Sequence, residues 1–218
     1  MDLIKLRTED PVRRHVDKDV DDEEMSPLEP PDALNPPGAG QSVAYEQMHP
    51  YLQEFRDEHK LCIAELEAVE TALTQVQQHG PNQEAHQVFA HFFEFLETDL
   101  LPHNRREESG LFPLLARRLL ESGEHSQGNE PTTGVDVLEA DHMMFIQLSA
   151  AMFSLFGVSG YLNDQPSQRI VIEQGIQQGV ALVEKLRLHI FREDEVIFSL
   201  AQNRISSEEF DRMPRKSK

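Results

Sequence analysis

The 218-residue sequence has little of what marks several classes of protein. It has one cysteine, Cys62, so no disulfide can form within the chain. It has no run of about eighteen apolar residues, so we expect no transmembrane helix. Its first residues lack the apolar stretch of a signal peptide. These absences predict a soluble protein of a reducing compartment, and hence a cytoplasmic location.

Positive charge is also scarce. The chain has 20 Lys and Arg against 39 Asp and Glu, which gives a net charge of −19. Nucleic acids and anionic membrane surfaces attract basic patches, so the sequence predicts neither as a partner. Against this acidic background stand ten histidines. Because histidine is the commonest protein ligand of metal ions, a metal site is the first function to consider.

The first 40 residues have the composition of a disordered tail. Residues 17–24 are mostly acidic, and five prolines follow between residues 27 and 37. Such a segment buries too little apolar surface to offset the entropy lost on ordering. We therefore expect a solvated tail over residues 1–40. An acidic segment that docks on an unknown protein partner is the alternative.

The rest of the chain has the three- and four-residue apolar periodicity of amphipathic helices. The first helix has a candidate start at Ser42, with Pro50 suited to a first turn, and ends near Gly80. Three more are expected over about 82–119, 134–157 and 166–203, and nothing indicates a strand. Residues 41–205 are therefore predicted to form an all-α, up-down-up-down four-helix bundle.

Two smaller features of these helices carry expectations of their own. Pro102 lies inside the second helix and is expected to kink it, because proline removes a backbone donor. Pro113 is expected to kink it again or to end it. The stretch Ser206-Ser-Glu-Glu209 has the pattern of a capping box. It predicts a short helix within a C-terminal tail, residues 206–218.

Two stretches of the predicted helices share one pattern, His103-Asn-Arg-Arg-Glu107 and His189-Ile-Phe-Arg-Glu193. Residues four apart on a helix project from the same face. The first and third helices each carry one histidine on the apolar stripe, His59 and His142. His59 precedes His103 by 44 residues, and His142 precedes His189 by 47. The chain thus repeats one helical hairpin.

Two such hairpins, packed about a pseudo-twofold axis, bring four histidines and two glutamates to one level of the core. Imidazoles with carboxylates suit iron, manganese or zinc, whereas calcium and magnesium prefer oxygen ligands. Six ligands exceed what one tetrahedral zinc takes. They match two metal ions about 3.5–4 Å apart, bridged by Glu107 and Glu193. Core histidines satisfied by hydrogen bonds are the simpler alternative.

The chain resembles the hemerythrin-type HHE cation-binding proteins over about residues 42–205. The resemblance rests on four stretches: Asp57-Glu-His59, Leu100-Leu-Pro-His103-Asn-Arg-Arg-Glu107-Glu-Ser-Gly-Leu-Phe-Pro113, Glu139-Ala-Asp-His142 and Leu188-His189-Ile-Phe-Arg-Glu193-Asp-Glu-Val-Ile-Phe198. It implies a four-helix bundle that holds two non-heme iron ions, with manganese or zinc as alternatives. It also implies that Glu107 and Glu193 bridge the ions, and that the terminal ligands are His59, His103, His142 and His189.

The chain departs from the oxygen-carrying hemerythrins at one place. Those proteins have a further histidine four residues from the third-helix ligand, where this chain has Leu138 and Ile146. Glu139, three residues before His142, is expected to supply an oxygen ligand instead, as in carboxylate-rich di-iron bundles. The alternative is a helix-start carboxylate favoured by the helix dipole.

The leading hypothesis is a non-heme di-iron protein that senses, stores or handles oxygen, nitric oxide or iron. A di-iron enzyme that reduces oxygen or peroxide, or repairs damaged iron centres, is the second. A metal-regulated interaction module is the third. The motifs hold no dedicated general acid, which favours a binding protein. Glu108 and Asp194, next to the bridging glutamates, are expected on flanking faces as partners of the ligands; Arg105, Arg106 and Arg192 are expected on a solvated face.

Overall fold

The computed structural model describes residues 43–126 and 131–216, and every regular element within them is helical. The all-α prediction is therefore confirmed for this part of the chain. The predicted tail over 1–40 and the candidate helix start Ser42 lie outside the described residues.

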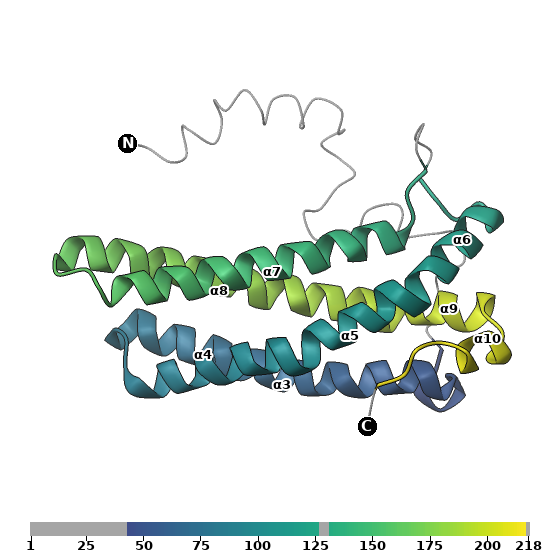
Figure 1. The fold of residues 1–218 in the computed structure, drawn as a ribbon, viewed down its shortest axis with the longest axis horizontal. Helices are drawn as coiled ribbons and strands as arrows, with labels where there is room; N and C mark the ends of the chain where they lie inside the picture. Colours follow the sequence, from purple (N-terminus) through teal and green to yellow (C-terminus); the bar gives the residue numbers. More distant parts are fainter. Residues whose placement is uncertain (1–42, 127–130, 217–218) are drawn as a thin grey trace. The chain divides into compact units, whose positions relative to one another are not determined.

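Four long helical rods make up the fold (Figure 1). The first is α3 (Pro50–His79) and the third is α7 (Gly134–Ser159). The second contains α4 (Gln83–Phe95), η4 (Leu96–Leu100), α5 (Leu101–Arg106), η5 (Glu107–Leu111) and α6 (Phe112–Ser122). The fourth contains α8 (Gln165–Arg192), η6 (Glu193–Ile197) and α9 (Phe198–Arg204). A 3₁₀ turn, η3 (Tyr45–Gln47), precedes α3, and α10 (Ser207–Asp211) follows α9. Contacts join α3 to α4, α6 to α7, α7 to α8 and α8 to α3, so each rod packs against its two neighbours, and α6 also contacts α9 across the bundle.

Local sequence signals explain where the rods begin and end. Asn82 caps the second rod, because its side-chain oxygen accepts from the Ala85 amide at 2.9 Å. Asp164 caps the fourth in the same way, from the Ser167 amide at 2.9 Å. Gly123 ends the second rod with φ 81°, in the left-handed region that favours glycine. The predicted boundaries of the second, third and fourth rods agree with the observed ones to within a few residues, whereas the first rod begins at Pro50 and not near the candidate start Ser42.

The second rod continues through both of its prolines. A π turn precedes each one, η4 before Pro102 and η5 before Pro113. Proline crowds the carbonyl four residues back and cannot donate to it, and the wider turn gives that part of the backbone room. Figure 1 shows the rod changing direction between α4 and α6, in keeping with the expected kink. The rod ends at Ser122, so Pro113 does not terminate it.

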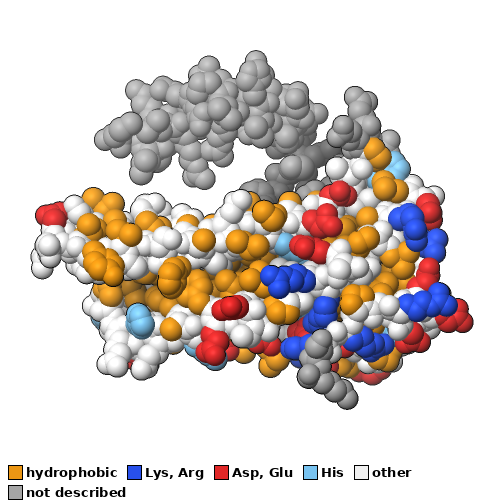
Figure 2. Space-filling model, viewed as in Figure 1, with side chains coloured by type: hydrophobic (Ala, Val, Ile, Leu, Met, Phe, Trp, Pro, Cys, Tyr) orange, Lys and Arg blue, Asp and Glu red, His pale blue; other side chains and the backbone are white. Residues whose placement is uncertain are grey.

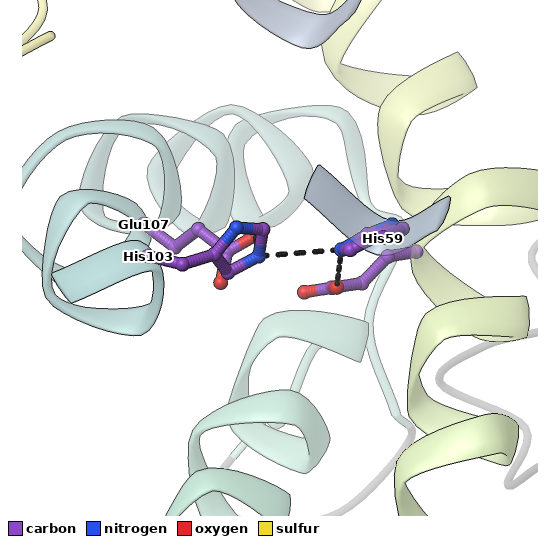
Figure 3. Close-up of side chains that lie close together, drawn as sticks. His59, His103 and Glu107 are labelled. Atoms are coloured by element: carbon purple, nitrogen blue, oxygen red, sulfur yellow. Dashed lines mark hydrogen bonds and ion pairs between the residues drawn. The ribbon is translucent and has the colours of Figure 1, made fainter. Parts of the chain in front are cut away.

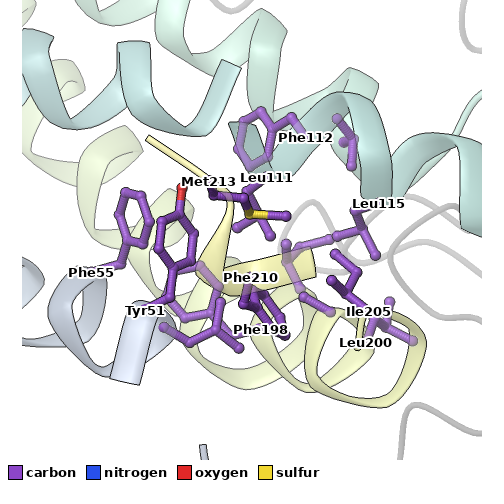
Figure 4. Packing of buried hydrophobic residues seen from close by; sticks show 14 of the residues in the cluster. Tyr51, Phe55, Leu111, Phe112, Leu115, Phe198, Leu200, Ile205, Phe210 and Met213 are labelled. Carbon is purple, nitrogen blue, oxygen red and sulfur yellow. The ribbon is translucent and has the colours of Figure 1, made fainter. Parts of the chain in front are cut away.

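Two apolar clusters fill the interior. One includes residues of α3, α6 and α9, and Figure 4 shows its aromatic side chains around Tyr51 and Phe198. The other lies among the later part of α3, α4, α7 and α8. The predicted helix at Ser206 forms as α10, and Phe210 within it is fully buried in the first cluster. Residues 206–213 therefore pack on the bundle.

The third rod has an unusually apolar outer surface. Among the described residues, α7 is the one helix long and apolar enough to cross a membrane by length and composition alone. Met143, Ile146 and Phe153 are 59%, 46% and 62% exposed on it, and Figure 2 shows hydrophobic side chains over this side of the bundle. Its inner face carries buried Asp141 and His142, which belong to the polar centre between the rods.

Candidate metal centre

Six polar side chains, at least one from each rod, meet in the interior. Four are histidines and two are glutamates, and none is more than 4% exposed: His59, His103, Glu107, His142, His189 and Glu193. Their potential ligand atoms form two groups of four, each with its atoms within 4.8 Å of one another. We call them half-site A, with His59 and His103, and half-site B, with His142 and His189. Glu107 and Glu193 belong to both.

The ring nitrogens within each half-site face each other. In half-site A, His59 Nε2 lies 3.2 Å from His103 Nε2, and Figure 3 shows these rings pointing toward one another with Glu107 alongside. In half-site B, His142 Nε2 lies 3.2 Å from His189 Nε2. The two halves therefore repeat one arrangement, as the sequence repeat predicts.

The two glutamates lie between the half-sites. Glu107 Oε1 is 3.4 Å from His103 Nε2, and its Oε2 is 3.5 Å from His142 Nε2. Glu193 Oε2 is 3.1 Å from His59 Nε2 and 3.3 Å from His189 Nε2. Each carboxylate thus contacts one histidine of each half-site, which is the placement a bridging ligand needs.

Each glutamate is also the first residue of a π turn, Glu107 of η5 and Glu193 of η6. Such turns occur often at functional sites. The phenylalanine five residues later packs on a histidine of another rod: Phe198 stacks on His59 at 5.6 Å, and Phe112 on His142 at 5.7 Å between ring centroids. The repeated Phe therefore holds imidazole rings in place.

The outward-facing Nδ1 atoms of the histidines meet a ring of carboxylates. Each of these carboxylates is a direct sequence neighbour of one of the six central residues. The Nδ1–oxygen distances are 2.9 Å for His59–Asp194, 2.7 Å for His103–Glu58, 2.9 Å for His142–Glu108 and 3.6 Å for His189–Asp141. A carboxylate at Nδ1 orients the ring and leaves Nε2 free for a metal. The flanking role expected for Glu108 and Asp194 agrees with this geometry.

Two arginines complete the ring, contrary to expectation. Arg105 is exposed as predicted, but Arg106 and Arg192 are only 8% and 9% exposed. Arg106 donates to Glu58, and Arg192 Nη1 donates to Asp141 Oδ2 at 3.0 Å. The prediction of a solvated face was therefore wrong for these two. The signal was present in the sequence, since both repeats have Arg directly before the glutamate.

Burial and charge strongly shift the pKa values of the central groups. Burial alone would lower the pKa of His59, but Asp194 and Glu193 outweigh it and raise the pKa to about 10. Burial alone would raise the pKa of Glu193, but His189 and His59 lower it to about 2. Each of these two buried groups thus favours its charged form, because an opposite charge lies beside it.

The two glutamates are poorly satisfied by the protein itself. All four of their carboxylate oxygens are buried and accept no hydrogen bond within the described part of the chain. Buried carboxylate oxygens that accept no hydrogen bond are costly, and a coordinated cation removes that cost. The donor set of imidazole nitrogens and carboxylate oxygens is one that transition metals prefer. The residues present therefore fit bound metal cations.

The structure does not bring Glu139 to the other six residues. Its side chain is exposed and belongs to neither half-site. Partial burial and the nearby charges of Asp136 and Glu108 raise its pKa. At the two positions four residues from His142, Leu138 is buried in an apolar cluster and Ile146 is 46% exposed. Half-site B thus gains no additional donor from these positions.

The sequence model of the hemerythrin HHE cation binding domain matches residues 51–201. The chain belongs to this family. No curated protein and no solved structure matches it. The HHE domain includes all six residues of half-sites A and B, and the cation-binding character of the family agrees with their donor set.

Proposed function

We propose that the HHE domain binds two iron ions, one in each half-site, and uses them to sense, store or handle oxygen, nitric oxide or iron. The observation that carries the proposal is the pair of four-residue groups that share two fully buried glutamates. His59 and His103 would hold one ion, and His142 and His189 the other, with Glu107 and Glu193 bridging. Manganese and zinc are the competing metals for such a donor set.

Charge balance supports two ions. The bridging glutamates supply two negative charges against four positive charges of two divalent cations. The outer carboxylates, each next to an Nδ1 atom, lie close enough to offset part of the remainder. Bound iron would supply a redox-active centre that can take a small ligand. The protein's own part is to orient the imidazoles and to keep water out, for which the two apolar clusters on either side are suited.

A small cleft adjoins half-site A. Its walls include Leu61, Cys62, Phe95 and Leu100, and it reaches His59 and His103. Cys62 lies three residues after His59, and the corresponding residue of half-site B, three after His142, is Phe145. The Phe145 ring packs edge-on against His189, with 4.9 Å between ring centroids. The cleft thus lies at the half-site that has the smaller side chain, Cys62, at this position. A narrow, mainly apolar entry suits a small neutral molecule such as dioxygen or nitric oxide.

The experiment is to measure bound metal and then mix the iron(II)-loaded protein with oxygen while recording its optical spectrum. Two iron ions per chain and a band that reverses when oxygen is removed support the proposal. Irreversible oxidation with continued oxygen consumption would assign an enzyme instead. A chain that holds one zinc ion and no iron would contradict the di-iron centre.

A further inference from the structure

The two half-sites repeat one plan, but the groups that hold their histidines differ. In each half-site a carboxylate lies directly before the histidine of the first or third rod and is the one nearest to Nδ1 of the other histidine. This carboxylate is Glu58 for His103 and Asp141 for His189. An arginine, Arg106 or Arg192, binds the same oxygen of each carboxylate that faces the histidine. Both carboxylates therefore face one histidine and one arginine, but one belongs to a glutamate and the other to an aspartate.

The shorter side chain, that of Asp141, does not come within hydrogen-bond distance of its histidine. Glu58 Oε2 lies 2.7 Å from His103 Nδ1, a short charge-assisted hydrogen bond. Asp141 Oδ2 lies 3.6 Å from His189 Nδ1, beyond hydrogen-bond range. Among the described residues, His189 Nδ1 consequently has no hydrogen-bond partner. Glu58 is also supported by Lys216, whose Nζ is 3.4 Å from its other oxygen.

The carboxylates at His59 and His142 also differ, and again the one in half-site A is held more firmly. Asp194, which binds His59, is 19% exposed, and Arg56 Nε lies 3.5 Å from it. Glu108, which binds His142, is 45% exposed. The position that corresponds to Arg56, three residues before the histidine, is Glu139 in half-site B. The carboxylate of half-site A is thus held by a cation, whereas the one of half-site B faces another anion.

A carboxylate at Nδ1 fixes the tautomer and orientation of a ligating imidazole and raises its basicity, and losing it typically costs about 10–100-fold in metal affinity. We propose that Glu58 and Asp141 are positioning residues that make the half-sites unequal, so that half-site A binds its metal ion more tightly than half-site B. The inference rests on the proposed metal-binding function. The exposed charge of Glu139 attracts a cation toward half-site B only weakly, because solvent and salt screen it.

The test must avoid the coupling between the two ions. Two equal half-sites also fill in two steps, because the first ion repels the second across the shared glutamates. His142→Ala leaves half-site A complete, and His59→Ala leaves half-site B complete. Cobalt(II) added to each variant without oxygen, and followed by its visible absorption, gives one dissociation constant per half-site. We expect the cobalt(II) dissociation constant of half-site A to be lower than that of half-site B by about 10-fold or more.

A reciprocal exchange then tests the cause. In the His142→Ala background, Glu58→Asp should weaken cobalt binding about 10-fold or more. In the His59→Ala background, Asp141→Glu should tighten it, a gain that damage to the fold does not produce. Far-ultraviolet circular dichroism checks folding, and the Asp141→Glu result stands by itself if Glu58→Asp unfolds the chain. Equal constants for the two half-sites, or no gain from Asp141→Glu, would overturn the inference while leaving metal binding intact. A parent chain that binds no cobalt would instead refute the proposed function, and the inference with it.

Discussion

Replacing Glu107 by glutamine should affect stability differently with and without metal. The Glu107 side chain is 0% exposed, and its oxygens lie 3.4 and 3.5 Å from a histidine of each half-site. Within the part of the chain that the structure describes, neither oxygen accepts a hydrogen bond, so the amide removes a buried charge without breaking one. The neighbouring His103 and His142 keep their own carboxylates, Glu58 and Glu108. The carboxylate also contacts His103 and His142, however, so relief of the buried charge and loss of these contacts oppose each other. The metal-free variant should therefore stay within about 1.5 kcal/mol of the parent.

With metal present the variant should be clearly less stable than the parent. A metal at a hundred times its dissociation constant stabilises a fold that alone binds it by about 2.7 kcal/mol. In a domain of this size each kcal/mol shifts the melting temperature by about 2–4 °C, so metal should raise that of the parent by about 5–11 °C. Glu107→Gln should lose most of this gain, because in the proposed centre its carboxylate would serve both ions.

The assay is thermal melting by circular dichroism, with chelator and with added iron(II) under anaerobic conditions. Glu139→Gln is the matched control, since it removes the same charge from an exposed side chain in neither half-site. It should melt like the parent in both conditions. If chelator leaves the parent unchanged, and Glu107→Gln also melts like the parent with iron(II), then Glu107 is not a metal ligand and the bridging argument fails.

Three further predictions address the rest of the chain. Deletion of residues 1–40 should leave metal content and helicity unchanged, since all six central residues lie beyond it; a large loss of either by elemental analysis or circular dichroism would show that the segment supports the bundle. Burial raises the pKa of Cys62 to about 12, so iodoacetamide at pH 8 should label it far faster in denaturant than in the folded protein, and equal rates by mass spectrometry would contradict its burial. Gly179→Leu should lower the free energy of unfolding by about 1–3 kcal/mol, because a Cβ there would lie 2.8 Å from the Leu73 methyls. The control Gly157→Leu should not lower it, because a Cβ at Gly157 meets nothing within 4 Å. Equal urea midpoints for the two variants would refute the packing argument.

Much of the centre could be predicted from local sequence, because a helix has a regular period. Four-residue spacing puts His103 with Glu107 and His189 with Glu193 on common faces whatever surrounds them. The similar spacing of the two hairpins predicts that these faces meet. The rod boundaries follow from equally local signals, such as the caps at Asn82 and Asp164.

The π turns and the buried arginines were not foreseen. A π turn needs an additional residue to be absorbed within a helix, and the apolar periodicity of η5 and η6 does not reveal it. Arg106 and Arg192 carry charges that are usually solvated. They are buried here because Glu58 and Asp141 come from neighbouring rods to pair with them.

The sequence by itself determined that four histidines and two glutamates lie on the inner faces of helices, since that depends on spacing within each helix. Only the tertiary structure decided which other polar groups join them. Glu139 and Arg56 occupy matching positions, three residues before a histidine, yet neither belongs to the central groups. Whether such a side chain turns inward depends on what the opposite rod presents. The 2.7 and 3.6 Å distances at His103 and His189 depend on side-chain reach across rods, which no periodicity within a single helix contains.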